Sequence, residues 1–123
     1  MTSRTIVIHG TMPSLNKYTD ACRSHPKSGA RMKSEAEALI AWQLGSKKPF
    51  PTPCRVCIAW YEPNRRRDVD NIRFGVKFVL DALVKAGILP GDSQRYVKEI
   101  RDSFDCDARD PRIVVTLEEA GGG

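Results

Sequence analysis

The chain has 123 residues, of which 41% are hydrophobic and 28% charged, a composition that predicts one globular domain with a single core. It contains no apolar run near the ~20 residues that cross a bilayer, and its first residues lack the apolar region of a signal peptide, so we expect a cytoplasmic protein with no membrane partner. The net charge of +5 suits a polyanionic partner such as nucleic acid, although charge alone does not identify one.

The first half of the chain predicts one strand, a basic loop and one helix. Isoleucines alternate with polar residues over residues 4–9, which favours a strand. Residues 14–33 carry many cations and almost nothing apolar to bury, so we expect a mobile basic loop there. A capping-box pattern at Ser34 and Glu37 then begins a helix over residues 34–44.

The second half predicts a strand, a long helix and two closing strands. Residues 55–61 alternate as a strand, and an apolar stripe marks a helix over residues 71–86, with Asp70 or Asn71 as its cap. Residues 95–100 and 112–117 are expected to form strands joined by an acidic hairpin loop. These elements predict one α/β domain over residues 1–120, with a mixed sheet of about four strands and two helices, and a disordered tail at 121–123.

The cysteines raise the alternative of a zinc site, because Cys54 and Cys57 form a Cys-x-x-Cys pair. Residues three apart on a strand face opposite sides of the sheet, and no second close pair of Cys or His exists. We therefore expect buried, reduced thiols instead of a metal centre.

Chemistry is concentrated in the segment Arg65-Arg66-Arg67-Asp68-Val69-Asp70-Asn71, where three cations precede two carboxylates. In an extended segment Asp68 and Asp70 project the same way and can share one metal ion, and Mg²⁺ prefers such oxygen ligands together with phosphate oxygens. The alternative interpretation is a helix cap beside a solvated basic run.

Two segments together resemble the RusA family of Holliday junction resolvases. The first is Asp68-Val69-Asp70-Asn71, followed by Lys77, which lies four residues before Asp81-Ala82-Leu83. The second places Asp92 in the turn before the next strand, and Pro13-Ser14-Leu15-Asn16 resembles the element that follows the family's first strand. The resemblance covers most of the chain.

The resemblance implies hydrolysis of DNA strands at four-way junctions, with Asp68, Asp70 and Asp92 as ligands of Mg²⁺, Mn²⁺ being an alternative ion, and Lys77 as a catalytic cation. Lys77 stands three residues farther from Asn71 than in the best-known members, so Arg73 is a rival for that role. The alternative role for Lys77 is an ion pair with Asp81 on the helix surface. The chain has no phosphate-binding glycine loop, and we expect no nucleotide cofactor.

DNA contacts are expected from the arginine run, from Arg73 and from polar residues of the basic loop. Trp42, Trp60 and Phe74 are candidates for stacking on unpaired bases, with a place in the core as the alternative. The expected DNA-binding residues are Arg65, Arg66, Arg67, Arg73, Asn16, Lys17, Arg23, Lys27, Arg31 and Lys33.

Geometry also predicts a homodimer. A helix over residues 71–86 is about 24 Å long, and the six steps from Ala86 to Asp92 retrace at most about 20 Å, so Asp92 has difficulty returning to Asp70 within one chain. A symmetric dimer with these helices antiparallel completes each site with residues of the partner. The family resemblance also implies a homodimer, in a bacterial or phage context.

Two other functions fit the same residues. One is a non-catalytic module that binds branched or single-stranded DNA through its basic residues. Three uncompensated aspartates beside a phosphate argue against this function, because they repel the DNA. The other is a general nuclease of flaps or forks, which shares the chemistry and differs in substrate.

Overall fold

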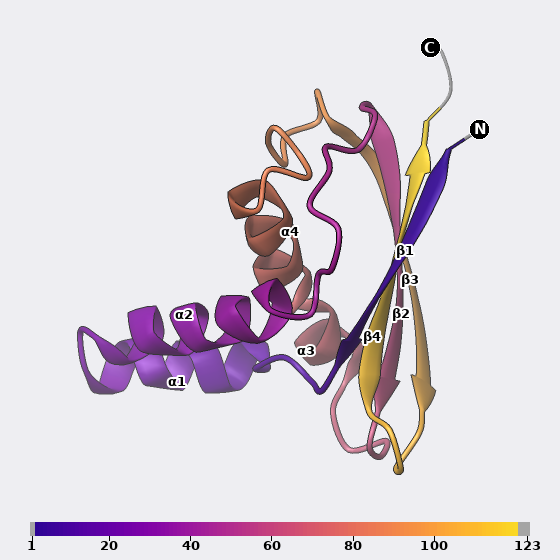
Figure 1. Cartoon of the computed structure of the whole chain (residues 1–123). Helices are drawn as coiled ribbons and strands as arrows, with labels where there is room; N and C mark the ends of the chain where they lie inside the picture. The colour runs from indigo at the N-terminus through magenta and orange to yellow at the C-terminus, as the bar shows by residue number, and fades with distance from the viewer. Residues whose placement is uncertain (1, 121–123) are drawn as a thin grey trace.

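In the computed structural model, which describes residues 2–120, all helices lie on one face of a four-stranded sheet (Figure 1). The strands are arranged in the order β1-β4-β2-β3. β4 runs antiparallel to both of its neighbours, whereas β2 and β3 are parallel. The predicted α/β class with a mixed four-stranded sheet is thus confirmed. The strands are β1 (Ser3–His9), β2 (Cys54–Glu62), β3 (Val97–Cys106) and β4 (Arg112–Glu119).

The helices occupy the two long connections of the sheet. One pair follows β1 and forms a helical hairpin that projects away from the sheet (Figure 1). The other pair crosses from β2 to its parallel neighbour β3, because parallel strands need such a crossover. The first pair is α1 (Leu15–Ser24) and α2 (Ser28–Ala41), and the second is α3 (Val69–Arg73) and α4 (Val76–Lys85).

The core forms where the helices meet the inner face of the sheet. Every second residue of β2 is buried, from Cys54 to Glu62, which is the alternation of a strand with one covered face. Trp60 from β2 and Phe78 from α4 are the largest fully buried side chains. Among the described residues, no helix is long and apolar enough to cross a membrane.

The predicted mobile loop over residues 14–33 is wrong, since α1 and most of the first half of α2 lie there. The Ser14 hydroxyl accepts a hydrogen bond from the Lys17 amide at 3.1 Å and so caps α1. One aromatic residue anchors this polar helix: the Tyr18 ring lies 5.5 Å from Phe74 and 5.8 Å from Phe78, measured between centroids. A single anchor is too little for a periodic signal in the sequence.

The expected capping box at Ser34 and Glu37 is also wrong, because α2 begins six residues earlier, at Ser28. Glu37 lies in the middle of the helix, and its buried carboxylate accepts from Lys85 Nζ at 3.1 Å. It therefore joins α2 to α4 instead of capping a helix.

The helix expected over residues 71–86 is divided into α3 and α4 by a break at Phe74 and Gly75. Its N-cap is Asp68, not Asp70 or Asn71. The expected hairpin between the last two strands is likewise wrong, because β2 lies between β3 and β4. The connection passes the end of β2, where the Asp107 amide donates to the Glu62 carbonyl at 2.8 Å. The tail at 121–123 lies outside the described residues.

Gly75 allows the helix break to pack closely against the core, and we predict that Gly75→Ala lowers the free energy of unfolding. A Cβ atom there would lie 2.8 Å from Met12 Cβ and 3.1 Å from the Trp60 ring. Such overpacking costs about 1–3 kcal/mol, which exceeds the gain in helix propensity at this junction. Urea denaturation followed by circular dichroism measures the change, and a variant as stable as the original chain would contradict the packing described here.

Candidate active site

The acidic segment lies at the start of α3, just beyond the end of β2. Asp68 caps the helix in an extended conformation, whereas Asp70 is its second residue, so the segment is not extended through both carboxylates as the strand argument assumed. Both side chains are exposed, and among the described residues neither makes an ion pair. Asp70 Oδ1 accepts from the Asn71 amide at 3.0 Å, and the other oxygens of the two carboxylates have no partner among the described residues, so they are available to a cation.

A buried ion pair holds this segment against the sheet. Glu62, the last residue of β2, has a side chain only 7% exposed, and both of its oxygens accept from Arg67, at 2.8 Å from Nε and 2.9 Å from Nη2. Arg67 Nη1 also donates to the carbonyl of Met12, in the segment after β1, at 2.9 Å. Arg67 was expected to contact DNA, but its guanidinium is engaged by these protein groups.

A second ion pair fixes the other end of α3. Arg73 Nε donates to Asp102 of β3 at 2.7 Å, and Trp60 Nε1 donates to the other oxygen of the same carboxylate at 2.8 Å. Asn71 adds a third anchor, because its side-chain oxygen accepts from the Asn16 amide at 3.1 Å. The short helix is thus tied to the sheet at one end and to α1 near its middle.

Lys77 differs from Arg73, its rival for the catalytic cation. It lies exposed in the first turn of α4 and makes no ion pair within the part of the chain that the structure describes. The alternative pair with Asp81 does not form, because Asp81 accepts from Lys33 of α2 at 3.4 Å. This contact with Asp81 raises the pKa of Lys33. Lys77 is thus the uncommitted cation of the two.

Asp92 is not brought to Asp68 and Asp70 within the protomer. It is exposed in the loop that follows α4, whereas the other two carboxylates lie before α3, and α4 separates the two positions (Figure 1). Over residues 2–120, no three Asp, Glu, His or Cys side chains gather closely enough to hold a metal ion. Asp68 and Asp70 lie two residues apart at the start of α3, and the role of the three aspartates as metal ligands stays a prediction.

The remaining predicted DNA contacts lie on two exposed regions. Arg65 and Arg66 are exposed in the loop before Asp68, and the residues expected on the basic loop lie on the helical hairpin of α1 and α2. Of these hairpin residues, Lys33 is paired with Asp81, as described above. The others are exposed: Asn16, Lys17, Arg23, Lys27 and Arg31.

The four cysteines are free, and Cys54 and Cys57 point to opposite faces of β2 as expected. Burial raises the pKa of the Cys54 thiol, which makes it unreactive. Cys22 is exposed, so the expectation of buried thiols is wrong for that residue.

Sequence reasoning missed Glu62 and Asp102, the two carboxylates that position the segment. The available signal for Glu62 was its place at the end of an alternating strand, where the pattern assigns it an inward position. An inward acidic residue five positions before an arginine indicates a buried pair.

We predict that Arg67→Met lowers the free energy of unfolding by about 2–5 kcal/mol, because it leaves the Glu62 carboxylate buried without a partner. The matched control is Arg66→Met, since Arg66 is exposed one residue away and its loss should cost at most about 0.5 kcal/mol. Urea denaturation compares the two variants. Equal midpoints would show that the pair does not stabilise the fold.

The chain was compared with families of known proteins. The family described as Endodeoxyribonuclease RusA matches residues 11–118, which include β2, the acidic segment, both helix pairs and most of the sheet. No curated protein matches the chain.

Proposed function

The chain belongs to the RusA family of endodeoxyribonucleases, hydrolases that act on DNA and include Holliday junction resolvases, and on that premise we propose that it nicks four-way junctions symmetrically with a divalent metal ion. The observation that carries the proposal is the pair of exposed, uncommitted carboxylates, Asp68 and Asp70, held beside a basic loop by the buried pair of Glu62 and Arg67. Carboxylates without a cationic partner repel DNA unless a cation lies between them.

The donor atoms suit Mg²⁺, or Mn²⁺ in its place, because these ions prefer a few carboxylate oxygens and leave room for phosphate oxygens. Asp68 and Asp70 would hold the ion. When bound, it supplies activation of water and stabilisation of the charge that develops on the phosphate. The protein's own part is to keep the two carboxylates in place, through the ion pairs of Arg67 and Arg73.

Lys77 is the cation that we propose to act on the DNA. Its ammonium is exposed and has no carboxylate partner among residues 2–120, so it is free to donate to a phosphate oxygen near the scissile bond. Arg73 instead positions α3, because its guanidinium is bound to the nearly buried carboxylate of Asp102. Arg65 and Arg66 would hold the flanking phosphates.

We further propose that Asp92 completes the site of a partner subunit. α4 has ten residues and is about 15 Å long. Asp92 lies beyond the end of α4 that is farther from Asp70. A twofold axis that sets two α4 helices antiparallel brings each Asp92 toward the other subunit's Asp68 and Asp70. Two sites related by a twofold axis also match a junction that needs two symmetric nicks.

The central test is cleavage of labelled four-way junctions, duplexes and flaps, with Mg²⁺ or EDTA, beside a binding assay. We predict that the original chain nicks the junction symmetrically with Mg²⁺ and that EDTA abolishes nicking. Asp70→Asn should lose at least about 100-fold in rate while it still binds the junction, because it removes a ligand without removing a DNA-contacting cation. Tight binding without any cutting would favour a non-catalytic DNA-binding module, and equal cutting of flaps would favour a general structure-selective nuclease.

Neutral variants of Lys77 and Arg73 distinguish the roles of the two residues. Lys77→Met should lower the cleavage rate by about 100-fold with little change in stability, because its side chain is exposed and unpaired. Arg73→Met should instead lower stability, since it leaves Asp102 without its ionic partner. Lys98→Met, a change at an exposed lysine of β3, is the matched control and should leave both quantities unchanged. Full activity of Lys77→Met would exclude its catalytic role.

Mixing two inactive variants tests the shared site. Asp70→Asn and Asp92→Asn should each fail to cut alone, but a refolded mixture should regain nicking, because a mixed dimer contains one site with all native carboxylates. A mixture that stays inactive despite subunit exchange, or a monomeric mass at micromolar concentration, would contradict the arrangement.

A further inference from the structure

A hollow between α2 and α4 has no part in the proposed chemistry. It has a volume of about 330 Å³, near the lower end of the range of about 300–1,000 Å³ typical of small-molecule sites. Within the part of the chain that the structure describes, its lining includes none of Asp68, Asp70 and Lys77. Alanines from both helices line it, and because an alanine side chain is a single methyl group, they leave space between the helices. These residues are Ala38, Ala41, Ala82 and Ala86.

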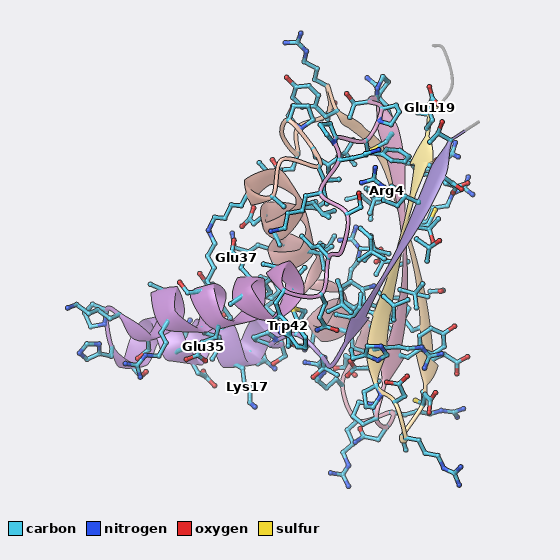
Figure 2. The ribbon with its side chains drawn as sticks, in the orientation of Figure 1. Arg4, Lys17, Glu35, Glu37, Trp42 and Glu119 are labelled. Carbon is cyan, nitrogen blue, oxygen red and sulfur yellow. The ribbon has the colours of Figure 1, made fainter. Side chains whose placement is uncertain are left out.

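One buried carboxylate in this α2–α4 hollow lacks a hydrogen-bond donor. The Glu37 side chain lines the hollow, is only 8% exposed and lies between α2 and α4 (Figure 2). Its Oε2 accepts from Lys85 Nζ at 3.1 Å, but its Oε1 is buried without a hydrogen-bond partner among the described residues. A buried carboxylate oxygen is costly when no group donates to it. Glu37 therefore has room for one more donor.

Two lysines add positive charge to the same hollow. The Lys85 side chain is 67% exposed, so its ammonium can move on its flexible stem and open Glu37 to a ligand in the hollow. Lys47 also lines the hollow, is exposed, and over residues 2–120 makes no ion pair. A ligand that fits the hollow must therefore bring both a cationic donor for Glu37 and an anionic acceptor for the lysines.

We propose that the α2–α4 hollow binds a free α-amino acid with a short apolar side chain. The ammonium group of the ligand donates to Glu37, and its carboxylate accepts from Lys85 and Lys47. In an α-amino acid the two charged groups are attached to one carbon atom, which matches Glu37 and Lys85, whose opposite charges lie 3.1 Å apart. The apolar side chain of the ligand lies against the alanines. This binding does not depend on DNA cleavage.

NMR titration of the isotope-labelled chain with L-valine tests the site. The backbone amides of the four alanines should shift along one binding curve, with a dissociation constant of about 1 mM, as expected for a ligand of so few atoms. Isobutylamine is valine without its carboxylate, and isovalerate is valine without its ammonium. Each should bind at least about 10-fold more weakly than valine, because each loses the hydrogen bonds of one charged group.

Variants of the lining test which groups bind the ligand. Glu37→Gln should bind valine at least about 10-fold more weakly, because it removes the charge that attracts the ammonium. Since Glu37 is buried and its replacement can disturb the fold, a second variant changes an exposed position: Ala41→Leu fills the hollow and should abolish binding. Ala30→Leu, at an exposed alanine of α2 outside this lining, is the matched control and should bind valine normally.

Amides that do not shift at the solubility limit of valine would overturn the proposal. Isobutylamine or isovalerate binding as tightly as valine would also overturn it, since the hollow would then hold a simple cation or anion. Normal binding of valine by Ala41→Leu would place the ligand elsewhere. Shifts of the same amides that follow protein concentration without any ligand would assign the hollow to a contact between two copies of the chain, which contradicts an amino-acid site.

Discussion

The ion pair between Glu62 and Arg67 is the contact on which the candidate site depends. A carboxylate buried at the end of β2 is costly unless it is paired, and Arg67 satisfies both of its oxygens while it also reaches the Met12 carbonyl. The segment after β1 and the end of β2, which are distant in sequence, therefore meet at one guanidinium. Because Asp68 is the next residue, its backbone cannot shift far without exposing or unpairing Glu62. The stability of this end of the sheet and the position of the acidic segment are thus coupled.

The crossover from β2 to β3 determines what one protomer can assemble. α3 and α4 together carry the chain from the acidic segment to the other end of the helical layer, and Asp92 follows them there (Figure 1). A protomer of this shape presents two acidic positions, one before α3 and one after α4, and the proposed dimer is what would bring them together. The helix break at Gly75 changes the path between them but does not fold it back.

Strands β1, β2 and β4 were predictable because buried and more exposed residues alternate along them, whereas β3 shows no such alternation. The helices were harder to predict from the sequence. α1 is polar apart from Tyr18, whose contacts with Phe74 and Phe78 are tertiary, and the apolar stripe of α4 continues in register through the break at Gly75. The acidic and basic residues of the candidate site were predicted from their motif, and their roles stay predictions. Which of these residues are free and which are paired depends on contacts with Glu62 and Asp102. The exposure of Trp42 and the burial of Trp60 depend on packing. The local sequence reveals neither these contacts nor this packing.

The most direct measurement is the product formed from a supercoiled plasmid that extrudes a cruciform. If the proposed dimer carries two symmetric active sites, it cuts both strands within a single binding event, so we predict linear DNA as the first product with Mg²⁺ and no cutting of the relaxed plasmid. Accumulation of nicked circles as the final product, or equal cutting of the relaxed plasmid, would contradict a paired site that selects the four-way junction.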